Sequence, residues 1–448
     1  MLRERGRLLE SLRPCFARAQ VWVQAGKYVA AVMSDLPERN GWSVARFCGD
    51  ATPDKTQRLL NHASWDTAGA MSAVRRYAVA GLDEAARRNR RAGGLRVGAL
   101  DESGQEKAGA ATAGVKRQYM GCAGRVANGI NTVYLSYVRE ETGHALIGAR
   151  QWIPREQIAD PVTSLVTGLP LDLAFRTKGQ LAAGLVAGAL ADGAAFDFIA
   201  GDEVYGASPD LRGYLQSCGQ AYVLRVASSF PLAMPGGKTL TCAQAAGTLL
   251  KGKRAWEVRS AGSGSKGQRW YAWAWLATAS AERSLLVRRH LKTGELAFHY
   301  CHVPAGQPGG KARLIRAAGL RWPAEEGFEF GKDQFGLDQC QARLYTAIAR
   351  HTLLVMAALA VCAVAAALLR PRAASALPPP APGQRAPADC GLIPLTVPEI
   401  RRVTAALTTR PLPPPLIFHW DAWTRRHQAR ARWYHQRARL QRDHTLVS

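Results

Sequence analysis

The chain has 448 residues, 47% of them hydrophobic, so it is long enough for two or three domains and is not a disordered polypeptide. Its 59 Lys and Arg residues outnumber 34 Asp and Glu residues and give a net charge of +25. Such an excess favours a polyanionic partner, because cations that neutralise phosphates release condensed counterions. Nine scattered cysteines without a CxxC pair argue against a disulfide framework or a zinc ribbon.

Residues 1–92 are basic, and their hydrophobic residues recur at helical spacing, which predicts a helical DNA-binding domain. The break at 50–54 places Pro53 at the start of a helix that carries Gln57 and Arg58 on a polar face. Such a face can contact phosphates and base edges, although an ordinary solvated helix has the same composition. A charged run ends at Gly93-Gly94 and marks the domain boundary.

Residues 93–218 change to a strand pattern, which predicts the first part of an α/β core. Three strands (95–100, 131–138 and 145–153) precede a helix near 181–190 and a short strand at 196–200. Asp101 and Asp202 each follow one of these strands directly. Three strands, a helix and a further strand that ends in an acid is the order of the ribonuclease-H fold, so we expect a ribonuclease-H-like core with a mixed sheet.

Residues 219–312 are again strand-like and predict a β-rich insertion into this core. The segment 270–275 alternates aromatic with small residues, which favours a core face over a DNA-stacking face. Residues 313–370 then form the second, helical part of the core. Within it, 353–369 is a 17-residue stretch without charge, which we interpret as a buried core helix, with a membrane span as the alternative.

The C-terminal part of the chain begins with a Pro/Ala linker at 371–390. Residues 391–448 predict a short helix and a basic tail with seven arginines between positions 425 and 442. Clusters of this kind commonly bind phosphates.

The carboxylates are the candidates for chemistry. Cleavage of a phosphodiester requires an activated water or hydroxyl and a stabilised leaving oxygen, and two divalent cations supply both. Mg²⁺ prefers oxygen ligands, so several acids must converge. A third acid, Glu325, lies on a predicted helix whose start is marked by Pro323. At about 100° per residue, Glu325 shares a helix face with Arg321 and Lys332.

Three blocks in this order resemble the catalytic blocks of DDE transposases of the insertion-sequence 701 family. They are Asp101-Glu102-Ser103-Gly104 followed by 114–128, Gly201-Asp202-Glu203-Val204-Tyr205-Gly206, and Arg321-Trp322-x-x-Glu325-Glu326-x-Phe328-x-x-x-Lys332 with Arg350-His351. The amino-terminal Asn40-Gly41-Trp42 and Gln57-Arg58-Leu59-Leu60, and the segment from Pro394 to the basic tail, are similar as well. Ala318 stands where the wider group has a tyrosine before the arginine.

The resemblance implies a bacterial enzyme of the cytoplasm and nucleoid that binds terminal inverted repeats and cleaves and joins DNA strands by Mg²⁺-dependent hydrolysis and transesterification. Asp101, Asp202 and Glu325 would hold two Mg²⁺ ions, with Mn²⁺ as a substitute. Arg321, Lys332, Arg117, Gln57 and Arg58 would contact double-stranded DNA, in a homodimeric synaptic complex without a membrane. The alternatives are a catalytically inactive or domesticated DNA-binding protein of the same fold and a metal nuclease that does not transpose.

Overall fold

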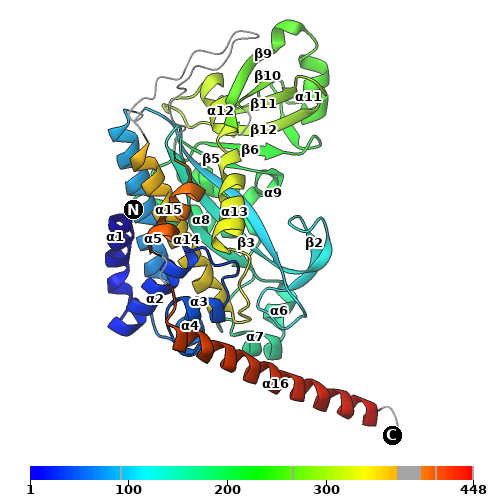
Figure 1. The fold of residues 1–448 in the computed structure, drawn as a ribbon. Helices are drawn as coiled ribbons and strands as arrows, with labels where there is room; N and C mark the ends of the chain where they lie inside the picture. The colour runs from blue at the N-terminus through cyan, green and yellow to red at the C-terminus, as the bar shows by residue number, and fades with distance from the viewer. Residues whose placement is uncertain (91–92, 265–266, 371–394, 409–410, 446–448) are drawn as a thin grey trace.

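The computed structural model describes residues 1–90, 93–264, 267–370, 395–408 and 411–445, and side chains of the last segment to 437 (Figure 1). The predicted linker at 371–390 lies outside the described residues.

The centre of the molecule is a mixed sheet. β1 pairs antiparallel with β3, and β3 pairs antiparallel with β4. On its other side β1 pairs parallel with β5, and β5 pairs parallel with β6. The order β4-β3-β1-β5-β6 is consistent with the predicted ribonuclease-H-like core. The strands are β1 (Arg96–Glu106), β2 (Lys116–Met120), which pairs with the start of β3, β3 (Arg125–Arg139), β4 (Gly143–Trp152), β5 (Phe198–Gly201) and β6 (Tyr222–Val226).

The segment predicted as a β-rich insertion extends this same sheet, because β12 pairs antiparallel with β6. Local sequence patterns indicate strands but not which distant strand each one joins. Trp273 of β10 is buried in the core, whereas Trp270 and Trp275 are about half exposed. The elements are β7 (Pro231–Ala233), β8 (Thr239–Thr241), α11 (Cys242–Leu249), β9 (Glu257–Gly264), β10 (Gly267–Ala277), β11 (Arg283–His290) and β12 (Leu296–His302), with a 3-10 turn at Lys253–Ala255.

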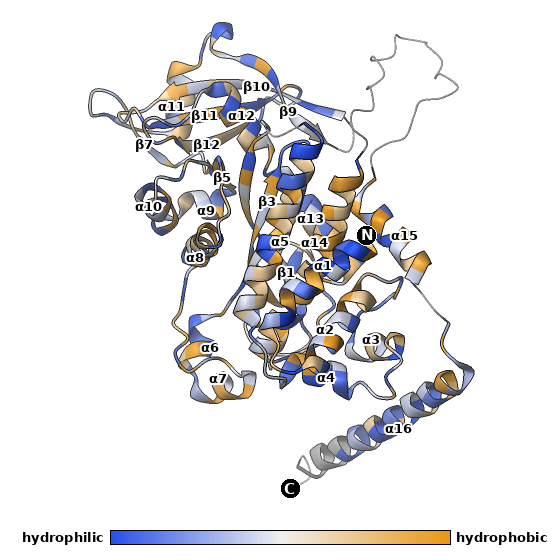
Figure 2. Ribbon diagram, turned by 90° about the vertical axis from the view of Figure 1, so that its left-hand side faces the viewer, coloured by the Kyte–Doolittle hydropathy of each residue, from blue (hydrophilic) through white to orange (hydrophobic). Residues whose placement is uncertain are grey.

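Helices from both ends of the chain pack together at one side of the sheet (Figures 1 and 2). α5 packs against β4 and α14, and α1, α2 and α4 also contact α14. The helices of this group are α1 (Leu2–Leu12), followed by a 3-10 turn at Arg13–Cys15, α2 (Ala19–Val32), α3 (Gly41–Phe47), α4 (Asp54–Asn61), α5 (Thr67–Arg88), α14 (Tyr345–Leu369) and α15 (Val397–Thr408).

The uncharged stretch 353–369 lies in α14, and every residue from Leu353 to Ala367 is buried. The core-helix prediction is therefore confirmed. Within the part of the chain that the structure describes, α14 is the one helix long and apolar enough to cross a membrane, and 89% of its apolar window is buried inside the protein. Its lack of charge follows from this burial.

The two faces of β1 have different neighbours. Val97 and Ala99 share a core cluster with Leu314 of α12 and Ala324 of α13, whereas Leu100 shares one with Leu185 of α8. Alternate residues of a strand point to opposite faces, so Asp101 faces α13 and Glu102 faces α8.

The remaining helices are α6 (Arg155–Ala159), α7 (Pro161–Thr167), α8 (Lys178–Ala191), α9 (Glu203–Ala207), α10 (Pro209–Ser217), α12 (Lys311–Gly319), α13 (Trp322–Phe335) and α16 (Pro414–Thr445).

The packing of α14 on α5 is testable at Gly81. A Cβ added at Gly81 would lie 2.6 Å from both γ-methyl groups of Val364. We expect Gly81→Ala to destabilise the protein, because overpacking costs about 1–3 kcal/mol and exceeds the gain in helix propensity of about 1 kcal/mol. In a Val364→Ala background the same change should destabilise the protein much less, because only the Cβ of residue 364, at 3.2 Å, remains close. Denaturant unfolding of the four chains measures both effects, and an equal destabilisation in the two backgrounds would contradict this packing.

Candidate active site

The register of two parallel strands brings Asp101 and Asp202 together. Leu100 of β1 pairs with Gly201 of β5, and each aspartate is the next residue of its chain. β1 continues to Glu106, so Asp101 lies within a strand and not at its end as the sequence predicts. Asp202 is the N-cap of α9, where its Oδ1 accepts a hydrogen bond of 2.9 Å from the Val204 amide.

The third acid, Glu325, lies in the first turn of α13. This helix begins after Arg321, with Pro323 in its first turn where no amide is needed, and ends at Gly336 with φ +69°. Ala324 is buried against the sheet, and the side chain of Glu325 is 49% exposed. The predicted helix start is confirmed.

Arg321 bridges two of the three acids. Its Nη1 donates to Asp101 Oδ2 at 2.8 Å, and its Nη2 donates to Glu325 Oε1. Sequence analysis placed Arg321 on DNA phosphates, but in this structure its guanidinium contacts the candidate ligands. Helix rotation shows which face a residue occupies and gives no information on its partner.

Burial dominates the electrostatics of Asp101 and raises the pKa of this carboxyl to about 6. Arg321 and the amide of Glu102 lower the pKa, whereas the charges of Asp202 and Glu325 raise it further. Asp202 and Glu325 are therefore both near enough to influence the charge of Asp101. Two neighbouring acids, Asp101 and Glu325, share one neutralising cation, which is the electrostatic condition that a divalent ion would relieve.

Glu102 forms a second charged pair on the opposite face of β1, which the sequence analysis missed. Its Oε1 accepts from Lys178, the first residue of α8, and each side chain is about one quarter exposed. Tyr205 of α9 is fully buried, and burial together with the charges of Glu102 and Asp101 raises its pKa. The only feature of the sequence that could have indicated a role for Glu102 is its position directly after Asp101.

Two polar residues of α14 fix the position of α13 and of the amino-terminal helices. Burial lowers the pKa of His351 to about 4, so the ring is neutral near pH 7. Its Nε2 lies 3.0 Å from the Gly336 carbonyl at the end of α13, and its Nδ1 lies 2.8 Å from the Tyr28 hydroxyl of α2. Nε2 must then donate and Nδ1 accept. Arg350 donates to the carbonyls of Leu59 and Leu60 in α4.

The other predicted residues do not join the acids. Lys332 is half-buried further along α13, where it lines a small hollow with Ser103. Arg117 is exposed on β2, in the hairpin that projects from the sheet (Figure 1). Gln57 and Arg58 are exposed on α4, in the helical region.

The donor set suits a hard cation. Asp202 Oδ2 and Glu325 Oε2 accept no hydrogen bond from any residue that the structure describes. Within the same residues, no three His, Cys, Asp or Glu side chains are near enough to hold an ion as they are placed. The three acids must therefore move closer together before they can share one.

The structure therefore places Asp101 and Asp202 beside two neighbouring parallel strands of a mixed sheet, with Glu325 connected to Asp101 through Arg321. The profile of the family described as DDE superfamily endonuclease matches residues 11–291. The match covers more than half of the chain, and the chain therefore belongs to this family. Asp101 and Asp202 lie within the matched residues, and Glu325 lies beyond them.

Comparison with solved structures finds a piggyBac transposase in a synaptic complex with hairpin DNA, with 10% sequence identity and a TM-score of 0.36. The alignment covers 73% of this chain and 56% of that one, so the chain spans little more than half the length of that neighbour. No curated protein matches the chain.

The raised pKa of Asp101 has a measurable consequence for stability. Its folded-state pKa of about 6 lies above the unfolded value of 3.8, so folding favours the protonated form, and the stability present below pH 4 is lost as pH rises through 6. We expect Asp101→Asn to stabilise the metal-free protein at pH 7 by up to about 3 kcal/mol, and by close to zero at pH 4. Thermal unfolding in EDTA at both pH values measures the difference.

Asp197 provides the matched control for this measurement. Burial raises its pKa, but the Arg96 amide and side chain and the charge of Arg313 outweigh that effect and hold the pKa below its usual range. Asp197→Asn should therefore destabilise the protein at pH 7. A loss of stability with both substitutions would show that Asp101 is held as an ordinary ion pair.

Proposed function

We propose that this protein is a DNA transposase of the DDE type, close to the insertion-sequence 701 family. It would bind terminal inverted repeats, cleave the strands and join 3′ hydroxyls to target DNA, as a homodimer in the synaptic complex. The observation that carries the proposal is that Asp101 and Asp202 directly follow the paired residues Leu100 and Gly201 of two parallel strands, and that Arg321 connects Asp101 to Glu325 in the first turn of α13. We place the enzyme in the bacterial cytoplasm, at the nucleoid.

Asp101, Asp202 and Glu325 would hold two Mg²⁺ ions, with Mn²⁺ as a substitute, since carboxylate oxygens are the preferred ligands. When bound, the ions supply an activated oxygen nucleophile and stabilise the leaving oxygen. The side chains of the protein would supply the contacts to DNA. Arg321 balances the carboxylates in the metal-free protein, and its fork of N–H groups suits a DNA phosphate once the acids have another cation. Lys332 and Arg117 would contact phosphates further from the reacting bond.

A non-transposing DNA-binding protein of the same fold is the second candidate. The bridge from Arg321 to Asp101 and Glu325 favours it, because a cation of the protein already compensates two of the three acids. The two candidates differ in one property: only the transposase cleaves DNA in the presence of Mg²⁺ or Mn²⁺.

The acids are tested by paired substitutions. Asp202→Asn and Glu325→Gln each remove one ligand charge while keeping size, so strand cleavage should fall at least about 100-fold with DNA binding retained. The adjacent changes Glu203→Gln and Glu326→Gln should leave cleavage within about threefold, since Glu203 pairs with Arg225 and Glu326 lies beside His144. Cleavage is measured on a duplex carrying the DNA that flanks the gene. If the control substitutions reduced cleavage as much as the two triad substitutions, or if none of the four reduced it, this triad would be excluded.

The basic helix α16 is tested by truncation. Trp423 and His427 stack with each other and pack edge-on against Trp42 of α3, and the Trp420 indole donates to the Asp50 carbonyl at 3.0 Å. Removing residues 428–448 keeps this anchor and removes five arginines. The slope of log affinity against log salt should become shallower by about 0.9 for each phosphate that the arginines no longer neutralise. Changing the same five arginines to lysine should preserve the slope, and an unchanged slope after truncation would remove α16 from the DNA interface.

A further inference from the structure

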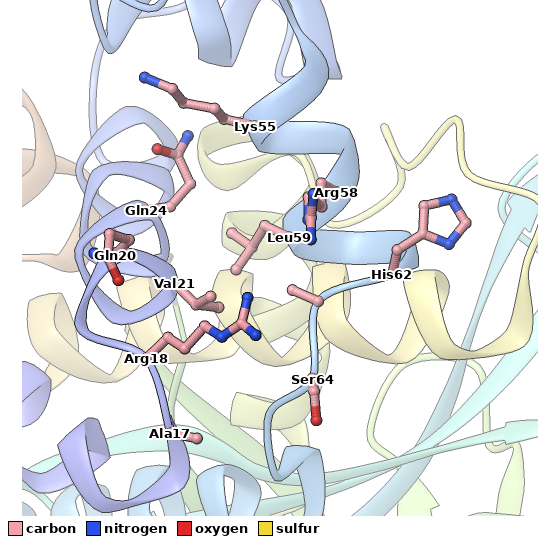
Figure 3. A pocket seen from close by; sticks show the side chains of 11 residues that line it. Ala17, Arg18, Gln20, Val21, Gln24, Lys55, Arg58, Leu59, His62 and Ser64 are labelled. Carbon is pink, nitrogen blue, oxygen red and sulfur yellow. The ribbon is translucent and has the colours of Figure 1, made fainter.

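A groove separates α2 from α4 on the surface of the helical region (Figure 3). It has a volume of about 990 Å³ and is partly open to solvent. Arg18, at the start of α2, and Arg58 of α4 line it from opposite walls, and Lys55 lies further along α4. Nothing in the proposed catalytic centre uses this groove.

The groove carries uncompensated positive charge. Arg18 and Arg58 are exposed, and neither has an acidic partner among the residues that the structure describes. No carboxylate lines the groove. Lys55 pairs with Asp50, but the same buried carboxylate also pairs with Lys27, so two cations share one acid. The groove therefore attracts an anion.

The apolar floor of the groove, and the hydrogen bonds that hold its two walls together, indicate what kind of anion fits it. Val21, Leu59 and Ala63 give the groove an apolar floor between the cationic walls. The walls are fixed relative to each other, because the buried Gln24 of α2 donates to Asp50 at 3.0 Å and to Thr56 of α4 at 3.3 Å. A chain that alternates anionic and apolar units, as sugar and phosphate do, matches cationic walls over an apolar floor.

We propose that this groove holds the sugar–phosphate backbone of one strand of duplex DNA, with Arg18 and Arg58 on phosphates from opposite sides. The proposal rests on DNA being the partner, as in the proposed function, and does not depend on the catalytic acids. It assigns Arg18, which the sequence analysis did not single out, and makes Arg58 a backbone contact, whose contribution is independent of base sequence. Gln57 lies outside the groove lining and stays available for a base edge.

The test measures binding without cleavage, in EDTA and in an Asp202→Asn background, so that a failure of the proposed chemistry cannot affect it. Fluorescence anisotropy is recorded with two labelled duplexes, one with the DNA flanking the gene and one of unrelated sequence, over a range of salt concentrations. We expect Arg18→Ala and Arg58→Ala each to weaken binding to both duplexes about tenfold at 0.1 M salt. In the double variant the salt slope should fall by about 1.8, at about 0.9 for each phosphate.

The matched control is Arg3→Ala with Lys251→Ala, which removes two exposed cations outside the groove and should leave the slope within error. Both exposed groove arginines lack partners within the described residues, so unchanged thermal unfolding should confirm that the variants fold. An unchanged slope in the groove variant would overturn the proposal. So would a loss confined to the duplex with the flanking sequence, or a loss of binding to vesicles containing phosphatidylserine with DNA binding intact.

Discussion

Burial of α14 is the interaction on which the rest of the structure depends. This 25-residue helix packs against β4, against α2 and α5 from the amino-terminal part and against α15 from the C-terminal part, and so connects the sheet to helices from both ends of the chain. Its residues from Leu353 to Ala367 are all buried, and removing their apolar surface from water stabilises the core. The polar residues at its beginning, Arg350 and His351, fix the neighbouring helices through specific hydrogen bonds.

The candidate site holds Asp101 in an environment that is unfavourable for its charge. Asp101 has a side chain only 15% exposed, and its charge is disfavoured by burial and by its acidic neighbours. Such a cost is typical of functional sites, where groups are arranged for a ligand and not for stability. Arg321 reduces this electrostatic cost, because its positive charge contacts two of the acids. The same positive charge competes with any cation that binds to them.

Much of this arrangement could be predicted from the sequence, because it depends on local patterns. Strand patterns before Asp101 and Asp202, and Pro323 before Glu325, are local signals, and all three elements occur, although β1 continues past Asp101 to Glu106. Contacts between residues that are far apart in the sequence could not be predicted in this way. The continuation of the sheet through β12 depends on the pairing of Phe298 with Val226, which are far apart in the chain. The bridge from Arg321 to Asp101 depends on how α13 lies on the sheet, which helix periodicity does not specify.

The hydrogen bonds from Tyr28 through His351 to the carbonyl of Gly336 link α2 to the end of α13. One wall of the groove and the helix that carries Glu325 are therefore attached to the same buried ring. A DNA segment held at the proposed groove would then have a position relative to α13 that is set by packing on α14. The spacing between that segment and the bond that is cut would be a fixed number of base pairs.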